Sequence, residues 1–129
     1  MASIYKRIQE FESLLNQDLP YEIKLRLEFT GKNKPDPSKV ITAVLDTTKI
    51  KEKALRSDSR KKEPLYARYY CFLIMSGVLK MKPGEIGEIF DRDRTSVIHA
   101  LGVIEDLVRL NKFVREEFTA CQLAFIESL

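Results

Sequence analysis

Five hydrogen-bonding side chains lie close together in the second half of the chain. Asp93, Arg94, Thr95 and Ser96 are consecutive, and His99 follows Thr95 by four residues, about one helical turn. They offer a carboxylate, a guanidinium, two short hydroxyls and an imidazole. These groups are the donors and acceptors that read base edges in the major groove of DNA. The cluster therefore indicates base recognition, provided that it is exposed at the start of a helix.

The patterns expected of an enzyme are missing. None of the five glycines stands in a GxxxxGK or GxGxxG loop, so no nucleotide cradle is predicted. The single histidine has no nucleophile beside it in the sequence, and with two cysteines it cannot supply a zinc ligand set. Cys71 and Cys121 lie in apolar runs and offer at most one disulfide; nothing near Cys71 lowers its thiol pKa, so Cys71 is expected in the core. We expect no enzymatic activity, cofactor or metal.

Length and composition fit one modest folded domain: 129 residues, 44% hydrophobic and 32% charged. The longest mostly apolar run, residues 69–79, is much shorter than the roughly 20 residues of a membrane-spanning helix. The charged N-terminus does not resemble a signal peptide. A cytoplasmic protein without membrane contact is expected.

Positive charge is concentrated in one segment. Residues 49–68 hold eight basic and three acidic side chains, a net +5 in a chain whose total is +3. This segment includes Arg60, Lys61, Lys62 and Arg68. A local basic patch favours contact with a polyanion. On charge alone, however, a solvated helix face explains the pattern at least as well.

The elements around the hydrogen-bonding cluster are typical of a helix-turn-helix. Pro83 begins a short helix, residues 91–93 form a turn, and a long helix runs over 94–110. Apolar residues of the long helix follow a helical period and predict one buried stripe: Val97, Leu101, Ile104 and Val108. The polar cluster then faces outward at the helix start, where a recognition helix contacts bases.

Further helices are predicted over residues 3–16, from Pro37 to about 46, over 51–55, from about Pro64 to 79, and over 112–126. Asp36 is the expected N-cap before Pro37. The last helix is expected to bury Phe113, Phe118, Leu123 and Ile126.

Residues 22–29 alternate between polar and apolar and predict one strand, for which the sequence shows no partner strand. The alternatives are pairing with a second copy of the chain, or a helix. We therefore expect a mainly all-α protein, divided into an N-terminal extension (1–34) and a helical domain (35–129). The extension is a candidate for dimerisation.

The sequences EIGEIF at 85–90 and RDRTSVIHA at 92–100 resemble the signature of the C-terminal DNA-binding domain of the bacterial replication initiator DnaA. The resemblance extends over about residues 38–126. It implies an all-α, Trp-repressor-like helix-turn-helix that binds double-stranded DNA in a sequence-dependent way. Without the initiator's ATPase module, the chain resembles a stand-alone DNA-binding unit that takes no nucleotide.

The resemblance also implies roles for single residues. Arg60 matches an arginine that enters the minor groove, and Asp93 matches an acid that accepts from cytosine. Thr95 and Ser96 match hydroxyls near thymine methyls and phosphates. His99 matches a histidine at a base edge, and Arg68 matches an arginine near the DNA backbone.

Charge and position add three phosphate contacts to these roles: Lys61, Lys62 and Lys82.

The chain departs from the family pattern at several positions. Asp91 stands in a turn that is one residue shorter than the usual one with two glycines. Arg94 replaces a histidine and could bond bidentately to guanine. Tyr69 replaces a glutamine, and Gly102 with Val103 replace basic residues. Two alternatives stay open: a protein-interaction module that has lost its DNA face, and a regulator of transcription or an accessory of phage replication.

Overall fold

The computed structural model describes residues 4–17 and 34–129 of the chain. The described residues form helices and no strand, which confirms the predicted all-α class. The predicted strand at 22–29 lies outside the described residues. The helices are α1 (Ile4–Asn16), α2 (Pro37–Thr48), α3 (Glu52–Arg56), α4 (Lys62–Gly77), α5 (Pro83–Phe90), α6 (Arg94–Leu110) and α7 (Lys112–Glu127).

The start of α2 shows the predicted local signal. Asp36 has extended backbone angles, and its Oδ1 accepts a hydrogen bond of 2.9 Å from the backbone N–H of Ser38. Pro37 occupies the first helical position, where its missing N–H costs nothing. The helix ends at Thr48, and the C-cap residue Lys49 has a left-handed φ of 61°. Helix α2 thus begins where the sequence predicts.

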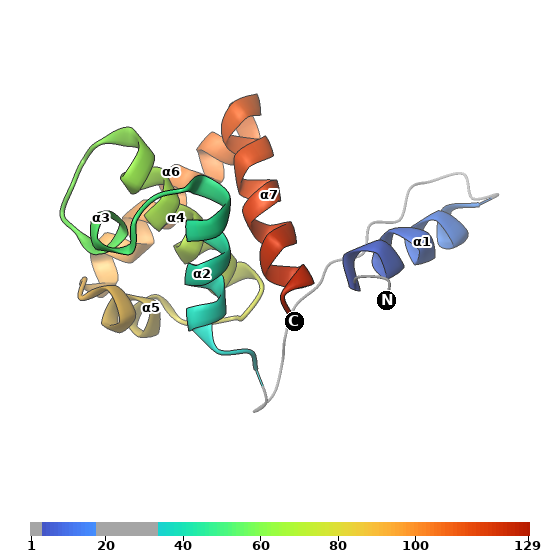
Figure 1. The fold of residues 1–129 in the computed structure, drawn as a ribbon, viewed down its shortest axis with the longest axis horizontal. Coiled ribbons are helices and arrows are strands. Elements are labelled where there is room, and N and C mark those ends of the chain that lie inside the picture. The colour runs from blue at the N-terminus through green and yellow to red at the C-terminus, as the bar shows by residue number, and fades with distance from the viewer. Residues whose placement is uncertain (1–3, 18–33) are drawn as a thin grey trace.

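Helix α4 is the centre of the bundle. It contacts α2, α3, α5, α6 and α7, and Figure 1 shows it enclosed between them. Its residues Ala67, Tyr70, Ile74 and Met75 are fully buried. A helix with apolar residues on most of its faces can satisfy them only in such a position. The predicted central helix is therefore confirmed, although it ends two residues earlier than expected.

Two buried cysteines contribute to this core as apolar side chains. Cys71 on α4 and Cys121 on α7 are both free thiols with no exposed surface. Burial raises the pKa of the Cys71 thiol and raises that of Cys121 to about 12. Because the thiolate is the reactive form, both groups are chemically quiet at neutral pH.

Helix α7 buries Ile126 as predicted, whereas Phe118 and Leu123 are only partly buried. Phe113 was expected in the core, but 63% of its surface is exposed, so that prediction is wrong. The buried stripe of α7 instead follows Val114, Cys121 and Phe125. Phe113 precedes Val114 by one residue, a rotation of about 100° around the helix. It therefore points away from the bundle, close in sequence to the exposed Leu110.

Helix α1 lies outside the bundle of α2–α7 and contacts α7 (Figure 1). Phe11 and Leu14 on α1 are more than half exposed. Dimerisation through the N-terminal extension stays a prediction. No helix in the described part of the chain is long and apolar enough to cross a membrane.

Candidate nucleic-acid interface

The turn between α5 and α6 is tightly packed. Asp91 closes α5 with a φ of 54° and a ψ of 51°, in the left-handed region. The backbone N–H of Arg92 then donates 2.8 Å to the carbonyl of Gly87. A Cβ atom on Gly87 would overlap the carbonyl oxygen of Arg92, so only glycine allows this approach. The close approach of the turn to α5 sets where α6 begins.

Asp93 is the N-cap of α6. Its Oδ1 accepts a hydrogen bond of 2.7 Å from the backbone N–H of Ser96. That hydrogen bond lowers the pKa of the Asp93 carboxyl, which stays ionised at neutral pH. A carboxylate at this end also suits the helix dipole. The cap uses Oδ1, and the Asp93 side chain lies at the protein surface.

The first turns of α6 present the polar cluster to solvent. All five of its residues are exposed: Asp93, Arg94, Thr95, Ser96 and His99. On the opposite side, Val97, Ala100 and Ile104 are buried against the bundle. Leu101 and Val108 are partly buried. The helix is therefore oriented as its apolar period predicts, with donors and acceptors on the outer face.

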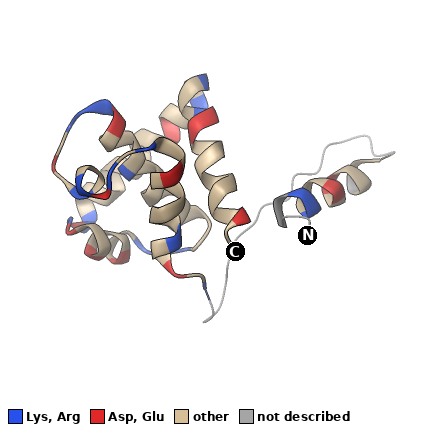
Figure 2. Ribbon diagram, in the orientation of Figure 1, with Lys and Arg blue, Asp and Glu red and all other residues tan. Residues whose placement is uncertain are grey.

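A short loop between α3 and α4, residues 57–61, holds part of the predicted basic patch. Serine hydroxyls shape it: Ser57 Oγ donates to the carbonyl of Ala54 at 2.7 Å and accepts from the backbone N–H of Ser59. Ser59 Oγ in turn accepts from the N–H of Lys61. Figure 2 shows lysine and arginine gathered where this loop enters α4. We call residues 57–61 the basic loop.

Arg60 and Lys61 of the basic loop are exposed, as is Lys62 in the first turn of α4. Lys62 Nζ lies 5.7 Å from the ring centroid of Tyr66. Lys82, the N-cap residue of α5, is also exposed. All four cations are thus exposed, and their contact with a polyanion stays a prediction.

Arg68 also has a role within the protein. Only 3% of its surface is exposed, it is among the residues that line the hollow described below, and its contact with a DNA backbone stays a prediction. Its Nε donates 2.9 Å to the carbonyl of Leu55, and its Nη2 donates to the carbonyls of Ser57 at 2.6 Å and Ser59 at 3.4 Å. A buried guanidinium needs such acceptors. Arg68 therefore fixes the basic loop from beneath.

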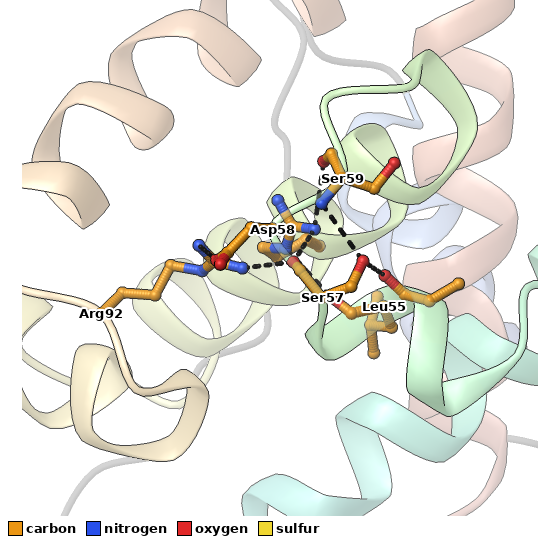
Figure 3. A network of polar contacts seen from close by, with 7 residues as sticks. Leu55, Ser57, Asp58, Ser59 and Arg92 are labelled. Carbon is orange, nitrogen blue, oxygen red and sulfur yellow. Dashed lines mark hydrogen bonds and ion pairs between the residues drawn. The ribbon is translucent and has the colours of Figure 1, made fainter.

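Arg92 belongs to this site, and the sequence analysis did not single it out. It was expected only as part of a turn, but its guanidinium donates to the carbonyl of Ser57 and, at 3.1 Å, to Oδ1 of Asp58. Figure 3 shows Arg92 reaching Ser57 and Asp58 of the basic loop. Since the partners are more than 30 residues apart, no local pattern could reveal the contact. Because Arg92 immediately precedes Asp93, the N-cap of α6, its contacts join the basic loop to the start of α6.

This connection brings the two predicted DNA-contacting elements together. Arg60 of the basic loop and Thr95, Ser96 and His99 of α6 line one surface hollow, with Tyr69 and Phe72 of α4 among its other lining residues. The basic loop and the start of α6 are therefore neighbours on one face. Arg94, Lys61, Lys62 and Lys82 are exposed but do not line the hollow.

Comparison with known proteins agrees with this geometry. Residues 37–104 match the family described as the bacterial DnaA protein helix-turn-helix. The chain is also 30% identical over 108 residues to the chromosomal replication initiator protein DnaA from two strains of Leptospira biflexa serovar Patoc. The match covers 82% of this chain but only 24% of those relatives. Because the family match takes in α2 to the middle of α6, the chain belongs to the bacterial DnaA helix-turn-helix family.

Proposed function

We propose that this protein binds double-stranded DNA in a sequence-dependent way, with the start of α6 in the major groove and Arg60 in the adjacent minor groove. The observation that carries the proposal is that Arg60, Thr95 and His99 line one hollow and are all exposed. A helix-turn-helix contacts bases with the first residues of its second helix. A cationic side chain beside it suits the negative potential of a narrow minor groove.

The residues divide by chemistry into two groups. Lys61, Lys62 and Lys82 are proposed to contact phosphates, which gives a salt-sensitive affinity independent of sequence. The exposed cluster on α6 is proposed to read bases. In it, Arg94 suits a guanine and the carboxylate of Asp93 suits the amino group of a cytosine, while the hydroxyls of Thr95 and Ser96 and the imidazole of His99 add further contacts.

The process served is proposed to be replication initiation or its regulation. The support is that the matched relatives are chromosomal replication initiators. The aligned part is only 24% of their length, so the proposal for this chain is limited to the DNA-binding step.

Selection of bound sequences from a random duplex pool tests the proposal. We expect a preferred site to emerge, bound more tightly than random duplex at every salt concentration. Arg60→Ala should weaken binding to all duplexes and reduce the salt slope by about 1. His99→Ala should lower the preference for the selected site by about fivefold to a hundredfold.

Two results would contradict this proposal. If no duplex is retained at low salt, the surface does not bind DNA, and the interpretation as a protein-interaction module is favoured instead. If duplexes bind but His99→Ala and the parent show equal preference, α6 is not the reading helix.

A further inference from the structure

Asp58 is an acid at a position where a phosphate-binding loop should have none. It lies two residues before Arg60, and its side chain is 98% exposed. An exposed carboxylate beside a phosphate backbone costs affinity through like-charge repulsion. Its ion pair with Arg92 is 3.1 Å long. The Arg92 side chain is only 20% exposed, so the arginine is largely buried while the aspartate lies in solvent. Its position calls for a role within the protein.

Arg92 is held more firmly than a surface arginine. One nitrogen of its fork donates to the carbonyl of Ser57, and the other donates to Asp58. Its Nε is buried and has no partner among the described residues, so the fork supplies all of its contacts to the basic loop. A planar guanidinium that binds two acceptors fixes direction as well as distance.

Two guanidinium groups donate to the carbonyl of Ser57. Arg68 approaches it from α4, and Arg92 approaches it from the turn before α6. Burial lowers the pKa of Arg68, and the neighbouring charge of Arg92 lowers it further, whereas Asp58 acts in the opposite direction. The carboxylate of Asp58 thus offsets the repulsion between two guanidinium groups that share one acceptor.

We propose that Asp58 and Arg92 form a positioning pair that sets where Arg60 lies relative to the recognition helix, and thereby determines sequence preference. Arg92 is the residue directly before Asp93, the N-cap of α6, and Asp58 is two residues before Arg60. The Arg92–Asp58 hydrogen bond therefore links these two positions. One ion pair and one shared carbonyl therefore join the major-groove and minor-groove elements. The inference rests on the proposed function and adds a determinant that touches no base.

The proposal predicts that loss of the Asp58 charge has opposite effects on affinity for random duplex and on preference for the selected site. Loss of the Asp58 charge removes repulsion, so binding to random duplex should rise. It also loosens the join, so contacts that need both grooves at once should weaken. An exposed ion pair has a small effect, so we expect the ratio of selected-site to random-duplex affinity to fall by about two- to fivefold.

Asp58→Asn is the test, and Asp91→Asn is its matched control. Both variants remove one negative charge from an exposed aspartate beside the interface, and asparagine tolerates the left-handed backbone of Asp91. We expect both to bind random duplex more tightly, and only Asp58→Asn to lose preference for the selected site. An unchanged ratio in both variants, or an equal fall in both, would overturn the proposal.

A double-mutant cycle between Arg92→Gln and Arg60→Ala supplies the second measurement. In the parent background, Arg92→Gln should lower affinity for the selected site by about tenfold, and in the Arg60→Ala background by less than about twofold. Arg92→Lys should recover only part of the loss, because an ammonium cannot reproduce the fork. Additive effects in a folded variant, checked by thermal unfolding, would overturn the proposal.

The failures of the two proposals are distinguishable. If Arg92→Gln does not fold, the comparison of Asp58→Asn with Asp91→Asn still decides, because Asp58 lies almost fully in solvent. If the parent shows no preferred site, the proposed function fails. If the parent has a preferred site and Asp58→Asn keeps the full preference, only the positioning pair fails.

Discussion

Substitutions at Gly102 can test the stability of α6 and its contact with DNA independently. It lies on the outer face of α6, seven residues after Thr95 and three after His99, where a Cβ atom would meet nothing within 4 Å. A glycine in an exposed helix interior costs about 1 kcal/mol relative to alanine. We therefore expect Gly102→Ala to raise the free energy of unfolding by about 1 kcal/mol, without changing DNA affinity.

Gly102→Lys also replaces the glycine by a better helix former, and in addition it introduces one positive charge. Lysine is nearly as good a helix former as alanine, so most of the stability gain should remain. One further phosphate contact adds about 0.9 to the slope of log K against log salt. The affinity gain over Gly102→Ala should then be about three- to fourfold larger at 50 mM salt than at 200 mM.

Two assays decide between these effects. Thermal unfolding of the free protein should show a rise in Tm of about 4–8 °C for both variants, the size expected for a domain of roughly 100 residues. Fluorescence anisotropy with a labelled duplex over a salt series should show a steeper slope for Gly102→Lys alone. If the lysine variant gains the stability but binds DNA as the alanine variant does, the outer face of α6 does not lie along the DNA.

Three further predictions concern stability. Asp91→Gly should stabilise the protein by about 0.5–1 kcal/mol in urea unfolding, because glycine adopts the left-handed conformation without strain; a loss of stability would contradict this. Tyr70→Phe should cost about 1 kcal/mol in the same assay, because it removes the 2.7 Å hydrogen bond to Glu117; no change would contradict it. The lowered pKa of Asp93 means that its cap stabilises the fold above the ordinary value of 3.8 and is lost as pH falls through the lower folded value. Unfolding midpoints measured between about pH 5 and pH 2 should therefore depend less on pH in Asp93→Ser, since a serine cap does not titrate; an equal dependence would contradict this.

The helices were predictable because their signals are local. Asp36 and Pro37 specify the start of α2, and the period from Val97 to Ile104 specifies which side of α6 is buried. Both depend on residues within a few turns of each other. Phe113 was wrongly predicted in the core, because one residue along a helix is a rotation of about 100° and the buried side of α7 depends on its packing against α2, α4 and α6.

The contacts that assemble the interface were not predictable in this way. Arg68 and Arg92 carry the same charge as Arg60, and the sequence alone cannot show which arginine is buried. Their acceptors are mostly backbone carbonyls, which every residue has and no motif marks. Only the folded chain brings the basic loop to the turn before α6.

Methylation interference on the selected duplex tests the central claim most directly. A methyl group on guanine N7 blocks the major groove, and one on adenine N3 blocks the minor groove. We predict that major-groove methylation within the site and minor-groove methylation beside it each prevent binding, and that Arg60→Ala removes only the minor-groove effect. Interference confined to one groove, or a minor-groove effect that survives Arg60→Ala, would contradict the account.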